Sequence, residues 1–308
     1  MIYNVRHLTT YRYASFVTFA RCVLRLTPQS SDRQTVSQHS ITVSPAPLQR
    51  IERLGPFGEQ TLTVVVDTAH RVLSIDALTR VDVHAPPVER WSDSPGWEAV
   101  RSLALESSVL GAAGPAAFLY PTARTPIVPE ITDYARSSFA VDRPIIEATA
   151  ELMTRIGDDF TFDAESSDVR TSAKDAFHAR RGVCQDFAHV MICALRGLGL
   201  PAAYVSGYLR TSPPKGRPRL AGADAMHAWV SVWCGEARGW VSFDPTNAVL
   251  VQDSHIVVAT GRDYADVAPI DGILLSPGEQ ILKTEVDVIP EDDFGSERSR
   301  AVDGSSAA

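Results

Sequence analysis

The segment most diagnostic of the fold is Arg181-Gly-Val-Cys-Gln-Asp-Phe-Ala-His189, which opens an apolar run ending at Gly197-Leu-Gly199. Cys184 follows a glycine-valine pair, in the first turn of the helix that this run predicts. The macrodipole and the unpaired N–H groups at a helix start stabilise negative charge, so they favour a thiolate at this position. The segment therefore predicts a rigid helix with a reactive thiol at its N-terminal end.

The predicted helix, 184–198, has one apolar stripe, formed by Phe187, Val190, Met191, Ala194, Leu195 and Leu198. Burial of this stripe would hold Cys184 at the end of a packed element, which gives a nucleophile a fixed direction. The competing interpretation is packing alone, because most cysteines in cytosolic proteins are small buried apolar residues. We interpret the other three cysteines in that way: Cys22, Cys193 and Cys234.

Two further reactive side chains are predicted to meet across a hairpin. Residues 226–234 and 239–244 read as strands, joined by Gly235-Glu-Ala-Arg238. If residue 234 pairs with 239, Asp244 lies diagonal to His227 on the same face, with Cα atoms ~7–8 Å apart. A loop of three or five residues would put them on opposite faces. The His227–Asp244 pair is therefore predicted conditionally on this register.

Cysteine, histidine and aspartate, in that chain order, are the groups of a thiol acyl-transfer enzyme. A thiolate attacks an amide carbon, the imidazolium protonates the departing amine, and the carboxylate orients the ring. A metal site would use the same residue types, but CxxC, HxxxH and HExxH are absent. His178, His189 and His255 have no matched spacing. We predict no metal and no cofactor.

The order of strand and helix signals predicts an α+β fold. In residues 1–86, short segments with the alternating pattern of β-strands are separated by clusters of Pro, Gly, Ser and Asp, which is typical of an antiparallel β-sandwich. Pro86-Pro87 marks the boundary of this region. Residues 87–270 contain helices, one of them with Asp142 as its expected N-cap, and then three strands, which indicates helices packed on an antiparallel sheet. Within 271–290, a strand signal at 281–289 is expected to return to the sandwich. The tail, 291–308, is predicted to be disordered.

Composition narrows the range of functions. The chain has 308 residues, of which 44% are hydrophobic and 21% charged, with a formal charge of −8. An acidic balance disfavours a nucleic-acid surface, and no apolar run approaches the ~18 residues of a membrane span. No secretory signal is readable at the start, and four cysteines without paired spacing suit a reducing compartment. We therefore predict a cytoplasmic protein.

Four motifs resemble those of the bacterial transglutaminase-like family, within the transglutaminase-core, papain-like cysteine-enzyme superfamily. They are Arg181–Met191, Gly199-Leu-Pro-Ala-Ala-Tyr-Val-Ser-Gly-Tyr208, Met226-His-Ala-Trp-Val230 and Phe243-Asp-Pro-Thr-Asn247. The resemblance continues through residues 255–269 and into the N-terminal strands at Tyr3–Tyr13 and Leu24–Pro28. It implies a papain-like transglutaminase core preceded by a β-domain.

Carried over residue by residue, the resemblance implies that Cys184 is the nucleophile, His227 the general acid/base and Asp244 the orienting carboxylate. Two positions depart from the family's pattern. Its F-x-Y pair is Phe160-Thr-Phe162 here, so that hydroxyl is absent. Its D-x-F-G-N turn is Gly55-Pro-Phe-Gly-Glu59.

The sequence therefore predicts a cysteine-dependent amide-bond enzyme that forms a thioester with a peptide or protein substrate. Hydrolysis, as in a protease or amidase, is preferred. The alternatives are a transglutaminase, which transfers the acyl group to an amine, and a non-catalytic protein-binding module. The Cys184 N–H is one candidate oxyanion donor. Accessory candidates are Gln185, Asp186 and Trp229, although Asp186 also suits a helix first turn and Trp229 a core. The oligomeric state is left open.

Overall fold

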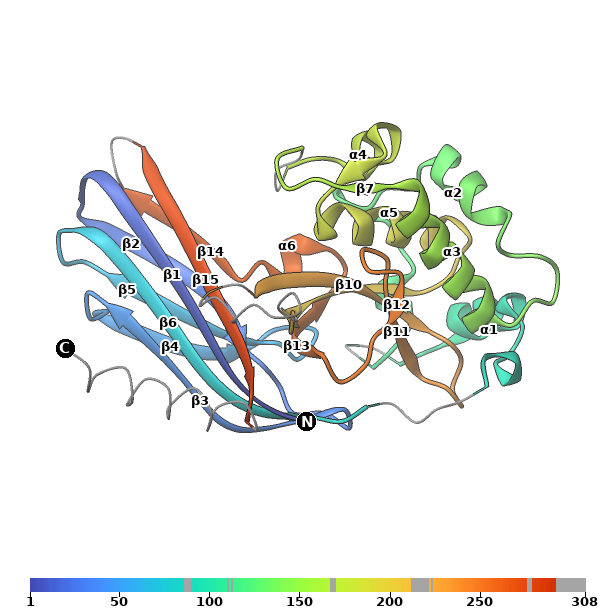
Figure 1. Ribbon diagram of the computed structural model, residues 1–308, viewed down its shortest axis with the longest axis horizontal. Coiled ribbons are helices and arrows are strands. Elements are labelled where there is room, and N and C mark those ends of the chain that lie inside the picture. The colour runs from blue at the N-terminus through green and yellow to red at the C-terminus, as the bar shows by residue number, and fades with distance from the viewer. Residues whose placement is uncertain are drawn as a thin grey trace, which may run out of the picture.

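The structure is a computed structural model, and it describes residues 1–85, 90–109, 111, 113–166, 170–211, 222, 224–275 and 279–291. A strand-rich sandwich lies beside a second part in which helices cover a sheet (Figure 1). The α+β class is confirmed. Residues 292–308 of the predicted disordered tail, 291–308, and the residues at the Pro86-Pro87 boundary lie outside the described residues. Among the described residues, no helix combines the length and apolar character needed to cross a membrane.

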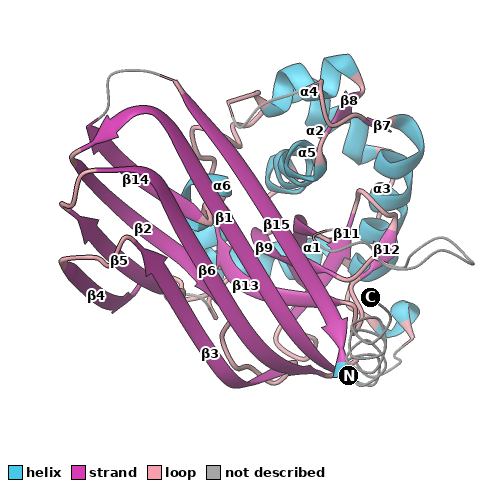
Figure 2. Cartoon of the chain, turned by 60° about the vertical axis from the view of Figure 1, so that its left-hand side comes forward, coloured by secondary structure: helices cyan, strands magenta, loops and turns pink. Residues whose placement is uncertain are grey.

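The sandwich consists of two four-stranded antiparallel sheets, seen face-on in Figure 2. One has the strand order β15-β1-β6-β3 and the other β14-β2-β5-β4. The strands are β1 (Ile2–Val17), β2 (Phe19–Thr27), β3 (Gln34–Ser44), β4 (Gln49–Leu54), β5 (Gln60–Val66), β6 (His70–Val83), β14 (Ile270–Leu275) and β15 (Gln280–Pro290).

Alternation along β1 builds the inner face of its sheet. Tyr3, Val5, His7 and Thr9 are all buried, while the residues between them are more exposed. At the other end of the described chain, β15 pairs antiparallel with β1, from Tyr3 opposite Pro290 to Tyr13 opposite Gln280. The sandwich therefore contains strands from both ends of the sequence.

The second part is built on a five-stranded antiparallel sheet of order β12-β11-β10-β9-β13. Its strands are β9 (Ala202–Leu209), β10 (Ala225–Trp233), β11 (Trp240–Asp244), β12 (Val249–Leu250) and β13 (His255–Gly261). The helices are α1 (Trp97–Glu106), α2 (Pro129–Arg136), α3 (Ile145–Asp159), α4 (Ala173–Ala179), α5 (Cys184–Gly197) and α6 (Tyr264–Val267). Two 3₁₀ turns, η1 (Trp91–Asp93) and η2 (Ala116–Phe118), and a short parallel pair, β7 (Thr161–Phe162) with β8 (Arg181–Gly182), complete it.

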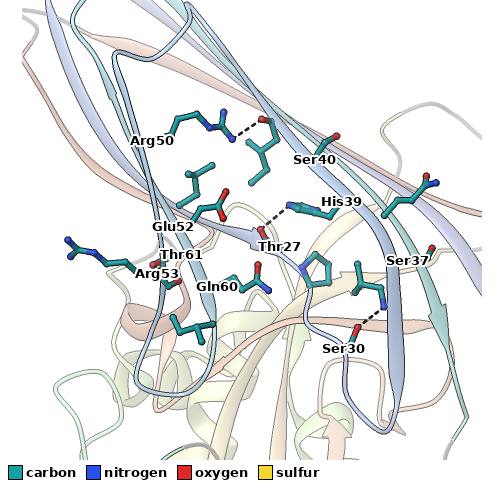
Figure 3. Close-up of a pocket in the computed structure, with 16 residues that line it drawn as sticks. Thr27, Ser30, Ser37, His39, Ser40, Arg50, Glu52, Arg53, Gln60 and Thr61 are labelled. Carbon is teal, nitrogen blue, oxygen red and sulfur yellow. Dashed lines mark hydrogen bonds between the residues drawn. The ribbon is translucent and has the colours of Figure 1, made fainter.

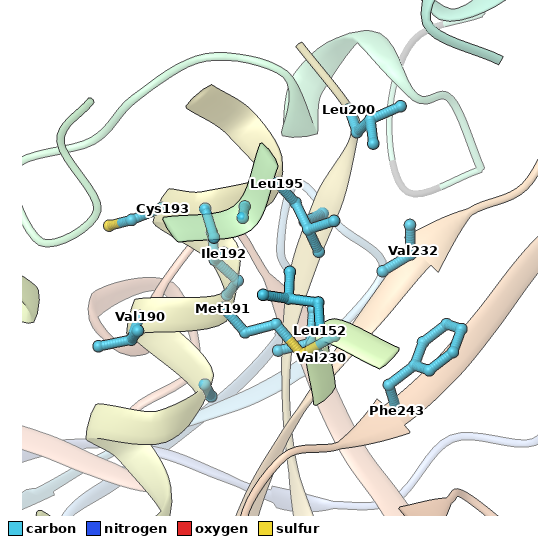
Figure 4. Packing of buried hydrophobic residues seen from close by; sticks show 14 of the residues in the cluster. Leu152, Val190, Met191, Ile192, Cys193, Leu195, Leu200, Val230, Val232 and Phe243 are labelled. Atoms are coloured by element: carbon cyan, nitrogen blue, oxygen red, sulfur yellow. The ribbon is translucent and has the colours of Figure 1, made fainter. Parts of the chain in front are cut away.

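Helix α5 is the most enclosed helix, because α2, α3, α4, β9 and β10 all contact it. The predicted stripe is buried, but so is every residue from Gln185 to Arg196. Met191 and Leu195 pack in one cluster with Val230 and Val232 of β10 (Figure 4). Each fully buried side chain of this size contributes about 1.5–3 kcal/mol of transfer free energy. Helix α5 is thereby packed against the sheet.

The sandwich and the sheet of the second part share an apolar contact. Tyr3, Val5 and Val288 of the sandwich lie in one buried cluster with Tyr208 of β9 and Ile256 of β13. The Asp224 carboxylate, just before β10, accepts a hydrogen bond from the Val288 N–H at 2.6 Å. Strands β9 and β13, and the start of β10, are thus also held by contacts with the sandwich.

One predicted helix cap is wrong. Asp142 does not cap α3: it adopts a left-handed conformation with φ of 57°, and Pro144 is the N-cap residue. The Ser94 hydroxyl accepts from the Ile146 N–H at 3.2 Å instead. This cap comes from a residue 52 positions away, which no local pattern around Asp142 could have shown.

Candidate active site

Cys184 is the first residue of α5, directly after the N-cap residue Val183. The Asp186 carboxylate accepts a hydrogen bond from the Val183 N–H at 2.8 Å, so this acid caps the helix. Gly182 is required by the same contact, since a Cβ there would lie 2.6 Å from Asp186 Oδ2. Cys184 itself is partly exposed and packs against the edge of the core. The helix start therefore presents a fixed and accessible thiol.

The hairpin register predicted from the sequence is confirmed. Val230 pairs with Phe243 and Trp233 with Trp240, and the Cys234 N–H donates to the Gly239 carbonyl at 2.8 Å. The four-residue loop therefore keeps His227 and Asp244 on one face of the sheet. His227 Nε2 lies 2.8 Å from Asp244 Oδ2, and Asp244 is fully buried.

Asp244 is anchored by the turn that follows it. Its Oδ1 accepts from the N–H groups of Thr246 at 3.0 Å and Asn247 at 3.3 Å. Such side-chain-to-backbone bonds are typical of an aspartate that begins a turn. Its Oδ2 is left for His227 and for the Asn247 amide, which donates at 2.7 Å. The Asp-Pro-Thr-Asn segment thus aims one carboxylate oxygen at the imidazole.

His227 joins the carboxylate to the thiol. Burial alone would lower its pKa, but the hydrogen bonds and charges of Asp244 and Cys184 outweigh burial and raise the pKa to about 10. Burial would likewise raise the pKa of Asp244, yet the hydrogen bonds from His227 and His255 hold that pKa well below its usual range. At neutral pH this favours a positively charged imidazole beside an ionised carboxylate. The structure thus brings Cys184, His227 and Asp244 together.

Two residues of the site were not predicted from the sequence. Asn247 belongs to the Phe243–Asn247 motif, but the motif predicts no role for it, and the spacing of His255 from the other histidines predicts no site. His255 is buried, and its Nε2 lies 3.1 Å from Asp244 Oδ2. Its strand, β13, is separated from β10 by β9. Only the sheet order reveals this neighbour, so no local sequence signal could have found it.

Gly207 of β9 leaves room for the indole ring of Trp229, which lies beside His227 and His255. It pairs with His227 on one side and Val257 on the other. A Cβ at this glycine would lie 2.5 Å from the Trp229 ring and 2.1 Å from the Ile256 carbonyl oxygen. Any larger residue would therefore displace the indole or open the strand pairing.

The accessory candidates are all in or next to the core. Gln185 is buried, and Asp186 is occupied as the helix cap. Trp229 is fully buried, with its ring centroid 6.1 Å from that of His227 and 5.2 Å from that of His255. It therefore supports the two imidazoles from the protein interior.

The other three cysteines are buried, as predicted. Burial raises the pKa of Cys193 to about 12 and also raises the pKa values of Cys22 and Cys234. These thiols stay protonated at neutral pH. Cys184, by contrast, is partly exposed and is hydrogen-bonded to a histidine.

Within the described residues, His227, Asp244 and His255 form one group of metal-ligand type, with ligand atoms within 4.8 Å of one another. The same atoms are joined here by hydrogen bonds of 2.8 and 3.1 Å through Asp244 Oδ2. The sequence-based prediction of no metal stays a prediction.

An open groove of about 890 Å³ lies on the sandwich, between the edge strands β3 and β4 (Figure 3). His39 lies on one wall and bonds to Thr27 at 2.9 Å, and Arg50 and Glu52 lie on the other. The residues that line this groove all fall between Thr27 and Leu62. It is therefore separate from the candidate active site.

A cysteine at a helix start, facing a histidine and an aspartate on an antiparallel sheet, defines the class: a transglutaminase-like, papain-like cysteine-enzyme core. Comparison with known proteins agrees. Residues 3–82 match the family model described as the bacterial transglutaminase-like N-terminal region, and residues 132–245 match that of the transglutaminase-like superfamily. The chain belongs to the bacterial transglutaminase-like family.

Some similar proteins match nearly the whole chain, and others match only part of it. An uncharacterized protein of Mycobacterium tuberculosis (strain H37Rv) is 41% identical over 299 residues, which cover 94% of this chain and 92% of that protein. A protein-glutamine gamma-glutamyltransferase of Pseudomonas aeruginosa is 35% identical over 99 residues, 30% of this chain and 15% of that protein. The crystal structure of "a Putative Cysteine Protease from Cytophaga hutchinsonii" superposes with a TM-score of 0.72 at 20% identity, over 95% of this chain and 92% of that one. That last similarity concerns the fold.

Proposed function

We propose that this protein is a cysteine-dependent enzyme that cleaves an amide bond in a peptide or protein through a thioester on Cys184. The observation that carries the proposal is His227, which is hydrogen-bonded to both Cys184 and Asp244 and whose pKa is raised to about 10. The imidazole can thus hold a proton at neutral pH beside the Cys184 thiol. Thiolate–imidazolium pairing of this kind activates a cysteine nucleophile.

In the first half of the reaction, the Cys184 thiolate attacks the amide carbon, and the carbonyl oxygen takes up negative charge. The Cys184 N–H, in the first turn of α5, has no acceptor within the helix and is a candidate donor to that oxygen. The intermediate collapses to the thioester when His227 gives its proton to the departing amine. Asp244 keeps the ring in place, because its Oδ2 accepts from Nε2 and leaves Nδ1 for the thiol side.

In the second half, an acceptor attacks the thioester carbon and His227 takes a proton from the acceptor. The C–S bond then breaks and the Cys184 thiolate leaves. With water as the acceptor, the product is a carboxylic acid and the enzyme is a hydrolase, which is the reaction that we propose. Transfer to an amine is the second candidate. It is favoured by the local similarity to the gamma-glutamyltransferase of P. aeruginosa.

A glutamine- and asparagine-containing peptide library, incubated with and without a fluorescent primary amine, tests both reactions. The hydrolase proposal expects peptide fragments or released ammonia without added amine, and no such products with the Cys184→Ala variant. If the peptide becomes fluorescent and little hydrolysis occurs, the hydrolase proposal is wrong and the protein is a transferase. If neither product forms and Cys184 reacts like an ordinary thiol, the site is non-catalytic and a protein-binding role is favoured.

We also propose that the protein is cytoplasmic, as its sequence predicts. All four cysteines are free in the structure, which suits a reducing compartment. Fractionation of cells that express the tagged full chain tests it: recovery with periplasmic or secreted markers would contradict this assignment.

A further inference from the structure

His255 approaches the proposed catalytic carboxylate from the side opposite the hairpin. Its Nε2 lies 3.1 Å from Asp244 Oδ2, and its side chain is 3% exposed. The same oxygen is 2.8 Å from His227 Nε2 and 2.7 Å from the Asn247 amide nitrogen. Three donors therefore converge on one carboxylate oxygen that is buried in the protein. Hydrogen bonds to a buried ionised group are among the strongest that proteins make.

The protonation of His255 follows from its two neighbours. An ionised carboxylate only accepts, so the nitrogen that faces Asp244, Nε2, must carry the proton. The other nitrogen, Nδ1, lies 3.2 Å from the Ser254 hydroxyl, which can donate to it. A ring that carries a proton on Nε2 fits this geometry, and Nδ1 can exchange a hydrogen bond with Ser254.

The strand that carries His255 is held from the sandwich. Val257 lies two residues further along β13, which is the edge strand of its sheet. The buried Gln34 amide of β3 accepts from the Val257 N–H at 2.9 Å and donates to the Val257 carbonyl at 2.8 Å. One side chain thereby pairs with an edge-strand residue as a neighbouring strand would. The strand that begins at His255 is therefore held to the sandwich two residues further along, at Val257.

We infer that His255 is a positioning residue: through its Nε2–H it orients Asp244 and keeps it ionised, and so sets the alignment of His227 with Cys184. This role rests on the proposed function. It adds a second imidazole to the proposed triad, one that touches neither thiol nor substrate. Loss of the donor would leave Oδ2 with two partners, His227 and the Asn247 amide, and would weaken the hold on the orientation of the carboxylate.

The test compares His255→Leu, which removes the donor, with His255→Gln, whose amide can place an N–H near the former Nε2. His7→Leu is the matched control. His7 is also buried, but it bonds to Thr9 at 2.9 Å and Tyr208 at 3.2 Å. The readout is the rate of Cys184 alkylation by iodoacetamide at pH 7 on the full chain, with EDTA present. Circular dichroism checks that each variant is folded.

We expect about a tenfold slower alkylation for His255→Leu, a rate within about twofold of wild type for His255→Gln, and no change for His7→Leu. Equal rates for wild type and His255→Leu would overturn the inference, as would equally slow rates for His255→Leu and His255→Gln. The second result would show that imidazole packing, and not the N–H, matters.

Histidine ¹⁵N NMR of the wild-type chain keeps the two proposals apart. The inference expects His255 with its proton on Nε2, whether or not Cys184 is reactive. A proton on Nδ1 alone would overturn the role of His255 and leave the thioester proposal standing. An unreactive Cys184 together with an Nε2-protonated His255 would overturn the enzyme proposal and, with it, the positioning role.

Discussion

The two ends of α5 carry two polar groups with opposite surroundings. At the N-terminal end, Cys184 is partly exposed and meets the imidazole of a charged network. At the C-terminal end, Arg196 is only 3% exposed. Four of its N–H groups are used: they donate to the carbonyls of Phe118, Ala202 and Arg262 and to the Thr125 hydroxyl, at 2.7 to 2.9 Å. Burial lowers the pKa of Arg196 to about 10.

The difference shows how to distinguish a buried polar group that only stabilises the fold from one that can take part in a reaction. The Arg196 donors end on neutral oxygens inside the protein, so the network is closed and can only stabilise. The network at the other end passes from Asp244 through His227 to a sulfur that solvent can reach. A buried polar network that ends on an accessible nucleophile is the one that can perform a reaction.

Replacing Cys184 by alanine should have the largest effect, because it removes the nucleophile. We expect acyl transfer to fall by on the order of 10⁴-fold or more, and covalent labelling at this position to disappear. Turnover of the peptide identified in the library screen measures the effect. The matched control is Cys193→Ala on the same helix: if it lost as much activity, the distinction between these two cysteines would fail.

Replacing Asp244 by asparagine should come next, since the ring would lose its orienting carboxylate. We expect a decrease of roughly 10²- to 10⁴-fold in kcat, with the variant still folded. The pKa of His227 should fall from about 10, because the hydrogen bond and charge of Asp244 help to raise it. A pH titration of the His227 ring by NMR measures this fall, and an unchanged titration would contradict the network.

His227 and Asp244 should also determine how the free energy of unfolding depends on pH. The pKa of His227 is raised on folding, so its contribution is present below about 6.5 and is lost as pH rises towards 10. The pKa of Asp244 is depressed, so its contribution is present above about 4 and is lost as pH falls. Urea unfolding at pH 3, 5.5 and 9.5 should therefore show greatest stability at 5.5. Asp244→Asn should flatten this dependence; an equally steep profile would show that other groups dominate it.

Replacing Arg196 by methionine should break the other end of the helix without touching the chemistry. Removal of the buried cation takes one donor away from each of four acceptors and should cost about 3–5 kcal/mol of unfolding free energy. Urea denaturation measures this loss. Arg136→Met is the control, because its pairing with Asp133 is exposed and should contribute at most about 1 kcal/mol. If folded Arg196→Met protein showed much slower Cys184 alkylation, the two ends would be coupled, against our interpretation.

Cys193→Ala should have the smallest effect. The side chain is fully buried among apolar neighbours, so its truncation should cost about 1–2 kcal/mol and leave the reactivity of Cys184 unchanged. Thermal denaturation and the alkylation rate measure the two quantities. A gain of stability would mean that the thiol is strained in the core.

What the sequence could predict was mostly local or periodic. The apolar stripe after Cys184 predicted α5, and the loop length at 235–238 set the register that brings His227 to Asp244. The turn of Asp244 with Asn247 is also encoded within four residues, although its hydrogen bonds were not foreseen.

What the sequence could not predict depends on distant strands. His255 lies on β13, which is separated from β10 by β9, and its contact with Asp244 depends on this strand order. Gly207 of β9 leaves the space that the Trp229 ring fills beside it. The cap that Ser94 provides for α3 likewise joins segments 52 residues apart. Strand order and long-range capping are set by how whole elements pack, so a local pattern contains neither.

The central claim is that Cys184 is an activated nucleophile paired with His227. The pH dependence of its alkylation by iodoacetamide, mapped by mass spectrometry on the full chain, tests it most directly. We predict that the rate falls by less than about tenfold between pH 8.5 and pH 6, and that Cys22, Cys193 and Cys234 stay unmodified. A fall of about a hundredfold or more, as for an ordinary thiol with a pKa of ~8.5, would contradict the claim.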